Sequence, residues 1–521
     1  MHFILIRIFF ILVLCCSCSG HDSTKNQEKS SYLRMATADD PLSLDPRLVR
    51  DLNTATIMHM LFEGLMTPSS KGKNVPAIAE TYTISEDKKT YTFHLRKSFW
   101  SDGSPVVAED FVETWKSILS PTFPAPNAYQ LYLIKGAKAA KEGTASAEEI
   151  GIKAPDHSTL IVELEQPASY FLEMVSCHFF FPVHKSMRTQ SENQANTVVS
   201  NGPFKLEKWI QRSELRLAKN PEYRNAEKVD LDGISLQVLD EHTALQLFKA
   251  GELDWAGSPL STLPQDAIAA LKRQNMLQII PGNGTHWFRL NTSKHPFNEK
   301  KIRRAFALAL NRQAIVEHVT QGNQLPAIGI VPPSFGISNQ NYYRDDNVSE
   351  AKRLFNQSLI DAGISKASFP TIAINYTSND RNHKIAQAVQ QQWVQAFGIN
   401  IVLNNNELHM QLDKIKTGNY DISMGSWYAD IEDPINFLEV FKSKDNPTNQ
   451  TYWEDETYSA LLDRSSHELD PENRRGILAE AEKILIEQMP VIPLFHSAYN
   501  YLKRDGLEGD YLPLTNRGSA P

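Results

Sequence analysis

Short strand patterns and longer helical patterns follow one another along almost the whole of this 521-residue chain. Residues 90–96 alternate polar and apolar side chains as an amphipathic strand does, whereas residues 300–319 carry apolar side chains at helical spacing. No stretch repeats at a fixed period, which argues against a solenoid or a propeller. Because the chain is also longer than one hydrophobic core organises, we expect a mixed α/β protein of two or three lobes.

The N-terminus predicts export. Apolar residues fill most of positions 3–14, a run that is too short to span a bilayer but typical of the central region of a secretory signal. We therefore expect a signal peptide over residues 1–18. The polar segment that follows, 19–31, is expected to be a flexible tether.

Residues 15–20 (CCSCSG) predict a lipid anchor at the end of this signal. The segment resembles the lipobox of bacterial lipoproteins, in which a cysteine thiol is diacylated and becomes the new N-terminus. Cys18 is the expected lipidation site. Cys16 stays an alternative because position 15 holds cysteine where the lipobox has leucine, and an ordinary cleaved signal is the other alternative.

Cysteine usage argues against a disulfide framework. The chain contains four cysteines, and three of them lie in the predicted signal. Cys177 is therefore left alone, and we expect it to be a small buried residue.

Local motifs of the common enzyme classes are absent from the sequence. It has no Gly-x-Ser-x-Gly elbow, no His-Glu-x-x-His helix and no Gly-x-x-x-x-Gly-Lys-Ser/Thr phosphate loop. The net charge of −8 gives no basic footprint for nucleic acid. The sequence thus predicts no catalytic residue, no cofactor, no metal site and no nucleic-acid partner, with a secreted peptidase as the alternative from another class.

Several segments match a known family in order and spacing. They begin with Ala79–Lys97, Trp100–Gly103 and Ala108–Phe111, and continue through Ser200–Phe204, Asn220–Tyr223, Leu290–Arg312, Gly418–Ile422 and Met489–Leu494. This pattern resembles the peptide/nickel class of solute-binding proteins of ABC importers. Within that class the chain is most similar to the periplasmic oligopeptide-binding proteins.

The resemblance implies an architecture. It is the two-lobed periplasmic-binding-protein fold of type II, an α/β fold with an extra domain on the N-terminal lobe. Carried over to this chain, lobe I comprises 32–62, 179–283 and 492–521. The extra domain is then 63–178, and lobe II is 284–491.

The segment from Trp427 to Pro434 resembles the family segment whose aspartate pairs with the α-ammonium group of a peptide. Asp430 is therefore the leading ligand-binding residue. Trp427 and Tyr428 would offer flat apolar faces with polar edges to varied side chains. The alternatives are that Asp430 caps a turn before Pro434 and that the two aromatic residues belong to the core.

Residues 251–259 match the region where family members run backbone against backbone with the peptide. Gly257 and Ser258 are expected to permit that approach. Trp255 is assigned to the ligand site as well, with a place in the core as the equal alternative.

Three further ligand-binding residues follow from the resemblance. Leu52 lies in a loop that matches a cleft edge, and His286 lies where aromatic residues line the pocket. Arg381 occupies a place corresponding to the basic residues that bind the peptide carboxylate, which a guanidinium can clamp at two points. Met424 departs from the family because close oligopeptide binders carry arginine there, which leaves ligand length and charge open.

The resemblance predicts the substrate-binding component of an ABC peptide importer. Its partners would be a short peptide ligand, an ABC permease complex in the inner membrane, and the membrane itself through the N-terminal lipid anchor. We expect a monomer on the periplasmic side of the bacterial cell envelope. A murein-derived peptide or a nickel chelate is the alternative cargo.

Overall fold

The computed structural model describes residues 32–49, 51–69, 74–188, 198–337, 342–446, 448–468 and 470–507. The predicted signal peptide, both candidate lipidation cysteines and the tether lie outside these residues. None of the described helices is long and apolar enough to cross a membrane.

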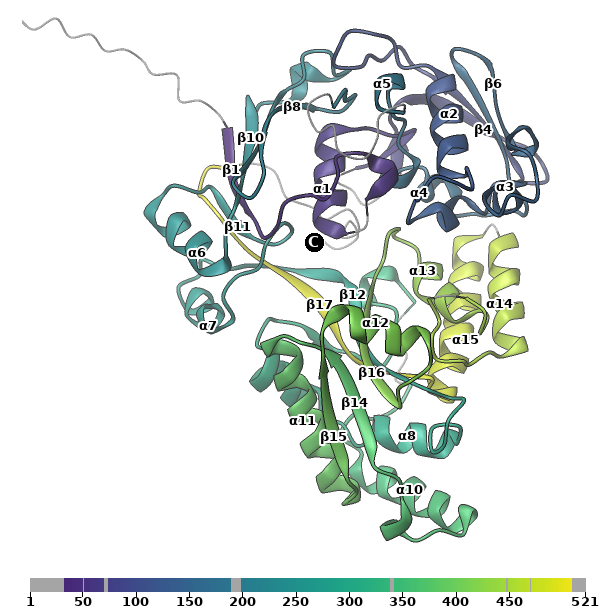
Figure 1. The fold of residues 1–521 in the computed structure, drawn as a ribbon, viewed down its shortest axis with the longest axis vertical. Coiled ribbons are helices and arrows are strands. Elements are labelled where there is room, and N and C mark those ends of the chain that lie inside the picture. Colours follow the sequence, from purple (N-terminus) through teal and green to yellow (C-terminus); the bar gives the residue numbers. More distant parts are fainter. Residues whose placement is uncertain are drawn as a thin grey trace, which may run out of the picture.

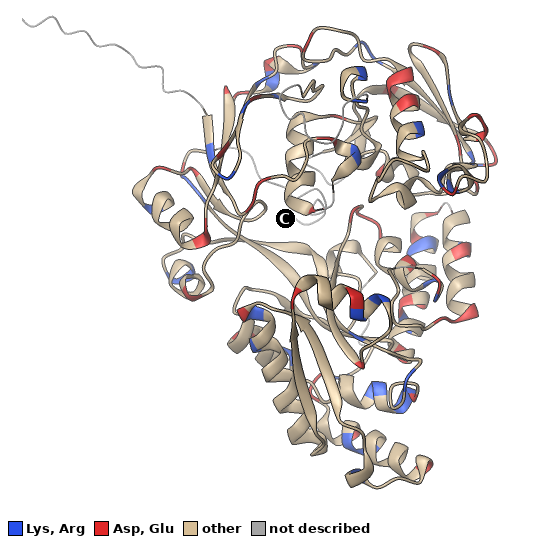
Figure 2. Cartoon of the chain, viewed as in Figure 1, with Lys and Arg blue, Asp and Glu red and all other residues tan. Residues whose placement is uncertain are grey.

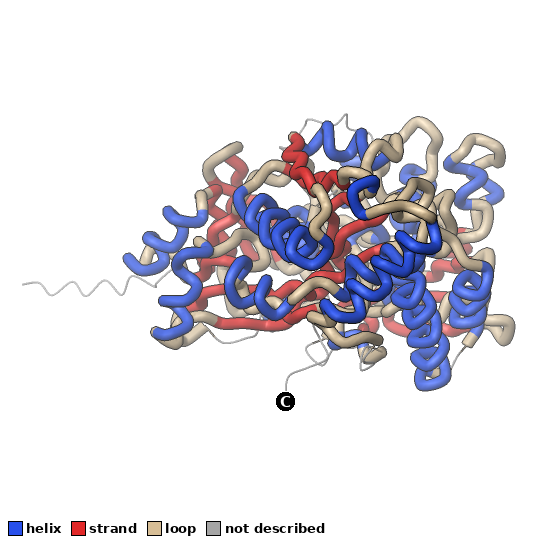
Figure 3. Tube along the Cα trace, turned by 90° about the horizontal axis from the view of Figure 1, so that it is seen from below, coloured by secondary structure: helices blue, strands red, loops and turns tan. Residues whose placement is uncertain are grey.

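One long sheet organises both halves of the molecule. Within the described residues it has eleven strands, which confirms the mixed α/β class. Figure 3 shows helices lying over these strands. The strands follow the order β15 (Ile401–Asn406), β14 (Ile372–Thr377), β16 (Ile422–Tyr428), β12 (Gln278–Leu290), β17 (Val491–Lys503), β11 (Trp255–Gly257), β1 (Tyr32–Thr37), β10 (Gly233–Val238), β9 (Glu214–Lys219) and β8 (Phe204–Ile210), with β13 (Leu325–Pro326) paired to β17 off this path.

The antiparallel pair of β12 and β17 connects the two halves (Figure 1). At one end β17 continues the sheet through β11, and at the other end β12 continues it through β16. The register of the pair shifts between Pro281 and Thr285 and again between His286 and Trp287. Such irregularities bend a strand and re-aim its side chains, so this pair sets how the two halves face each other.

Helices cover the long sheet on both halves. Those of the β1 half are α1 (Leu52–Leu61), α6 (Glu241–Ala250) and α7 (Gln265–Arg273). Those of the β14 half are α8 (Lys300–Leu308), α9 (Arg312–Ala314), α10 (Val348–Ala362), α11 (Asp380–Phe397), α12 (Leu408–Lys416), α13 (Ile435–Leu438), α14 (Glu456–His467) and α15 (Pro471–Gln488), with a π-helix at Ile315–Thr320. Acidic and basic residues occur along the ribbons of both halves (Figure 2).

A second, smaller sheet lies beside α2 (Ala108–Ile118), as Figure 1 shows. Its four strands follow the order β4 (Ala79–Ile84), β5 (Thr90–Leu95), β7 (Thr159–Glu163) and β6 (Ile152–Asp156). The pairing of β4 with β5 is antiparallel, and β5 confirms the strand predicted at residues 90–96. The hairpin β2 (Met66–Pro68) and β3 (Asn74–Pro76) precedes it, and α3 (Ala137–Lys141), α4 (Phe171–Met174) and α5 (Lys185–Arg188) accompany it together with α2. The residue boundaries given above for the lobes and the extra domain stay a prediction.

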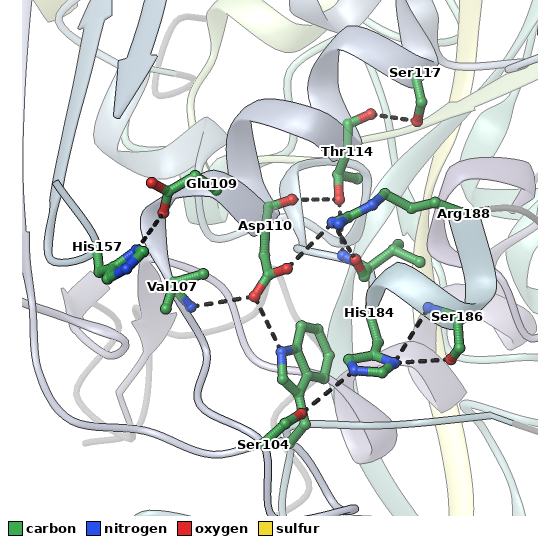
Figure 4. A network of polar contacts seen from close by, with 12 residues as sticks. Ser104, Val107, Glu109, Asp110, Thr114, Ser117, His157, His184, Ser186 and Arg188 are labelled. Atoms are coloured by element: carbon green, nitrogen blue, oxygen red, sulfur yellow. Dashed lines mark hydrogen bonds and ion pairs between the residues drawn. The ribbon is translucent and has the colours of Figure 1, made fainter. Parts of the chain in front are cut away.

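Asp110 ties the start of α2 to its surroundings (Figure 4). Its carboxylate accepts hydrogen bonds from the indole of Trp100 and the backbone N–H of Val107, both at 3.1 Å. It also pairs with Arg188 at 3.2 Å. Because Asp110 is only 7% exposed, these partners replace water that the carboxylate has lost.

Replacing this carboxylate should destabilise the fold. We expect Asp110→Ala to lower the free energy of unfolding by about 3 kcal/mol, because it leaves the buried indole N–H of Trp100 without its acceptor and Arg188 without its carboxylate. The matched control is Glu109→Ala on the same helix, whose contact with His157 is solvent-exposed and should matter by less than about 0.5 kcal/mol. Urea unfolding of the two variants checks this, and equal effects would contradict the assigned role of Asp110.

Candidate functional site

A small cavity lies where three distant segments meet. It is lined by Leu52, Ala55 and His59 of α1, by Glu173, Ser176, Cys177 and His178 around the end of α4, and by Ala429, Asp430, Ile431 and Glu432 after β16. The first two segments belong to the β1 half, and the third follows a strand of the other half. The volume of about 40 Å³ suits one small polar group rather than a whole ligand.

The carboxylate of Asp430 lines this cavity and has a neutral hydrogen-bond donor. The side-chain amide of Gln130 donates to Oδ2 at 3.0 Å. Burial raises the pKa of Asp430 to about 6, and the hydrogen bond from Gln130 offsets part of that shift. The proton is therefore held more tightly than by an ordinary aspartic acid, because the buried charge has little compensation.

The backbone at Asp430 is fixed from both sides. Asn436 Oδ1 accepts from the Asp430 N–H at 3.2 Å, and the Cys177 thiol donates to the Asp430 carbonyl oxygen at 3.2 Å. The turn before α13 is capped by Asp433, whose Oδ1 accepts from the Ile435 N–H. The side chain of Asp430 thus faces the cavity and does not cap this turn.

Asn283 anchors the same loop to the strand pair that joins the halves. Its side-chain amide donates to the Ala429 carbonyl oxygen at 2.7 Å, and its backbone carbonyl oxygen accepts from the Ala429 N–H at 3.0 Å. The hydroxyl of Tyr499, on β17, donates to the amide oxygen of Asn283. Asn283 is 1% exposed and lies within the irregular stretch of β12. The irregular stretch of β12 therefore also fixes Ala429, the residue before Asp430.

The cavity is electronegative. No lysine or arginine is among the described residues that line it, whereas Glu173 and Glu432 line it together with Asp430. Burial and the Asp430 charge raise the pKa of the neighbouring Tyr129 to about 12. Burial lowers the pKa of His178 to about 4, so this imidazole is neutral at pH 7. The arrangement favours a cationic group.

Three of the predicted residues form a second group beside the cavity loop. The hydroxyl of Tyr428 and Nε2 of His286 lie 3.1 Å apart and form a hydrogen bond. The His286 ring lies 4.7 Å from that of Phe495, and Arg381 lies over the Phe495 ring at 5.7 Å. Burial, with Arg381 adding to it, lowers the pKa of His286 to about 3. Arg381 is exposed as a residue, but partial desolvation lowers the pKa of its guanidinium.

Trp427 supports the cavity loop from behind. Its indole donates to Asn436 Oδ1 at 2.9 Å, the same atom that binds the Asp430 N–H. Its ring is partly buried against the main core. The structure therefore brings Trp427 close to Asp430 through a shared partner.

One edge of β16 is open. β12 pairs with β16 from Ile422 to Tyr428, but β14 pairs with it only at Ile422 and Ser423. Among the described strands, none pairs with residues 424–428 on the β14 side. An extended segment of another chain can add to such an edge through main-chain hydrogen bonds.

The structure gives Gly257 a different role from the predicted one. Its φ of +94° is the left-handed conformation that favours glycine, and a Cβ there would lie 2.5 Å from the Asn500 carbonyl oxygen on β17. Its N–H contacts Ser261 Oγ, and the Ser258 N–H donates to the Asn500 carbonyl. The close approach that requires glycine is to β17, and both N–H groups already have partners inside the protein.

Trp255 lies in the core, one of its two predicted places. It is 4% exposed, stacks on Tyr501 with ring centroids 4.4 Å apart, and donates to the Ser258 carbonyl. None of Trp255, Gly257 and Ser258 lines the cavity that holds Asp430 and Leu52.

Sequence reasoning missed the residues that the β1 half contributes opposite Asp430. These are Gln130, His178, Glu173 and His59, together with Glu432 beside Asp430 itself. Cys177 is 7% exposed, as expected of a small buried residue, but it also contacts the Asp430 carbonyl. A proline-rich, aromatic stretch at 120–129 just before Gln130 was the only sequence signal near this contact.

Ser104, His184 and Asp102 also approach one another near α2, and Figure 4 shows the contact between Ser104 and His184. The Ser104 hydroxyl donates to Asp102 at 2.6 Å. His184 Nε2 lies 3.3 Å from the same hydroxyl oxygen. The other ring nitrogen of His184 contacts Ser186 rather than a carboxylate. Since the serine proton is directed to Asp102, this group lacks the order of contacts that activates a serine nucleophile.

Comparisons with known proteins define the class. The model of bacterial extracellular solute-binding proteins, family 5, matches residues 73–449, and the chain belongs to this family. The Bacillus subtilis oligopeptide-binding protein OppA is 36% identical over 98% of this chain and 96% of its own length.

Solved structures agree with this assignment. The Escherichia coli murein tripeptide-binding protein MppA has a TM-score of 0.80 at 26% identity and covers 94% of this chain and 97% of its own. Haemophilus influenzae OppA in complex with the peptide RPPGFSPFR has a TM-score of 0.77 at 26% identity, with the same coverage. The predicted family and the two-lobed type II fold are thereby confirmed.

Proposed function

We propose that this protein binds short peptides between its two lobes and delivers them to an ABC permease complex. The observation that carries the proposal is the Asp430 carboxylate, which lies in an electronegative cavity lined from both halves of the molecule. The similarity to proteins named for oligopeptide binding supports the same cargo. The ammonium group of a peptide supplies the positive charge that this cavity lacks.

In this proposal the affinity comes mainly from the ends and the main chain of the peptide. Asp430 pairs with the α-ammonium group, and the open edge of β16 at residues 424–428 takes the peptide backbone. Tyr428 and His286 line the path beyond it, and Arg381 is the candidate partner for the carboxylate. Side-chain pockets can then stay roomy, which suits a carrier of varied peptides.

We further propose that the mature protein is a monomer, anchored to the membrane through a lipid on Cys18 or, failing that, Cys16. Both cysteines lie outside the described residues, so the support is the sequence pattern alone. A murein-derived peptide is the second candidate cargo, because MppA is among the similar structures. No described group of three or more His, Cys, Asp or Glu side chains is arranged to hold a metal ion, so no observation favours a nickel chelate.

The cargo can be identified directly. We expect protein produced in bacteria without residues 1–18 to retain small molecules that denaturation releases, and mass spectrometry should identify them as peptides with free α-amines. Muropeptide-specific sugar or diamino acid masses would favour the second cargo. Release of compounds without an α-amine alone would contradict the proposal.

Asp430 should account for recognition of the amine. For a synthetic copy of a released peptide, we expect Asp430→Asn to weaken binding by about a hundredfold, because a charge-assisted contact is lost inside a buried site. N-acetylation of the peptide should weaken binding to the original protein by a similar factor and leave binding to the variant nearly unchanged. Calorimetric titration of the four pairs checks this, and equal affinity for free and acetylated peptide would remove Asp430 from its role.

Peptide affinity should depend on pH below neutrality. The pKa of Asp430 is about 6 without ligand, so the carboxylate is the minority form at pH 5, whereas the α-amine stays protonated. We expect the association constant to fall about tenfold from pH 7 to pH 5. His178, with its pKa near 4, remains neutral over most of this window; Glu173, Glu432 and His59 also face the cavity. The control is Asp430→Asn, whose profile should be flatter, and an equally steep profile would assign the effect to those other groups.

A further inference from the structure

Arg289 carries a positive charge for which the described part of the fold supplies no counter-charge. It lies on β12, and no hydrogen bond or ion pair joins its guanidinium to another described residue. Burial lowers the pKa of Arg289, but an arginine stays protonated at pH 7. The neighbouring Tyr420 is neutral, because burial raises the pKa of its hydroxyl. A desolvated cation without a partner costs the fold free energy, so this side chain is a candidate for a contact with a ligand.

The guanidinium of Arg289 lies over the strand whose edge is open. In the register of β12 and β16, Arg289 is opposite Ser423, yet a Cβ built on Gly425 would lie 2.5 Å from Arg289 Cζ and closer still to Nη1. The side chain therefore crosses from β12 to the diagonal position on β16, and it has room there because residue 425 is glycine. Gly425 belongs to residues 424–428, which no described strand pairs on the β14 side. The charge is thus directed toward the open edge.

The nitrogen atoms of Arg289 are accessible. The residue is partly exposed. The described side-chain nitrogens that are both sealed from solvent and without a partner belong to other residues, among them Arg96 and Trp287. Since the nitrogens of Arg289 have no partner either, they retain accessible surface, and an atom of a ligand can approach them.

We propose that Arg289 binds a carboxylate of the ligand at the level of Gly425, so that a negative charge on the peptide determines which peptides are held most tightly. This inference rests on the proposed peptide function and narrows its substrate class. A peptide that adds to residues 424–428 runs past Gly425, and its carboxylate can accept two parallel N–H bonds from the planar guanidinium. The carboxylate belongs to an acidic side chain or to the C-terminus. Arg381 lies in a separate group with Phe495, so the contact adds to the one proposed there.

A peptide mixture identifies the charge and its place. Peptides of two to five residues, randomised over alanine, glutamine and glutamate, are prepared with free and with amidated C-termini. The protein is freed of bound molecules by reversible denaturation, and the peptides retained in equilibrium dialysis are sequenced by mass spectrometry. We expect the unaltered protein to prefer a carboxylate to an amide at one place by about tenfold, the effect of a hydrogen bond between charged groups. A preference for glutamate over glutamine at one position identifies a side chain, and a preference for the free C-terminus identifies the terminal carboxylate.

Three variants test whether Arg289 is the group responsible. Arg289→Gln should reduce the carboxylate preference to less than about twofold. Gly425→Ala should do the same with Arg289 still present, because the new Cβ displaces the guanidinium. The control is Arg353→Gln on α10, which removes the same charge from an exposed pair with Glu350 and should keep the preference. Urea unfolding of Arg289→Gln should show a midpoint no lower than that of the unaltered protein, because the substitution removes a charge without a partner.

The outcomes separate this inference from the proposed function. A carboxylate preference that survives in Arg289→Gln would overturn the inference, as would equal retention of carboxylate and amide forms by the unaltered protein. Loss of the preference in Arg353→Gln would assign it to net charge, and a lower urea midpoint of Arg289→Gln would assign Arg289 to the fold; either result also counts against the inference. If the unaltered protein retained no peptide at all, the proposed peptide function itself would be contradicted, and the inference with it.

Discussion

The site depends on one buried carboxylate, that of Asp430, whose negative charge is only partly stabilised by its hydrogen bond. Asp430 faces a cavity in which a neutral amide is its described hydrogen-bond donor, and its pKa rises from 3.8 to about 6. A shift of that size corresponds to on the order of 3 kcal/mol of unfavourable environment for the charged form. A cation that enters the cavity recovers this energy, because it supplies the opposite charge that the fold leaves out. The fold thus stores part of the binding free energy in the empty site.

The position of that carboxylate depends on the strands that join the two halves. Asn283, in the irregular stretch of β12, holds both main-chain groups of Ala429, and Tyr499 of β17 holds Asn283. His178 of the opposite wall, and Gln130, which donates to Asp430, come from segments that accompany the smaller sheet. A bend of β12 and β17 therefore changes the distance between Asp430 and its partners, because each wall is attached to a different side of the bend.

The sequence predicted Asp430 on one wall of this site, but only Leu52 on the other. Asp430, Trp427 and Tyr428 lie in one continuous segment, so a match to a family pattern can carry all three at once. Gln130 lies 300 positions from Asp430, and its contact is set by how two lobes pack, which no local pattern expresses. Gly257 shows a different limit. A glycine required by a positive φ and a close neighbouring strand looks the same in a sequence as one that makes room for a ligand, and only the 2.5 Å approach to Asn500 distinguishes them.

Ligand recognition is linked to the arrangement of the two halves, because residues of both halves line the cavity. Leu52 and His178 belong to one half and Asp430 to the other, so the complete cavity exists only while the halves are together. A ligand that contacts both walls favours an arrangement with the halves together only by its difference in affinity for that arrangement and for one with the halves apart. Gln130 reduces the difference, since its amide already satisfies part of Asp430 when no ligand is bound. The same neutral hydrogen bond already links the two halves in the structure, where no ligand is bound.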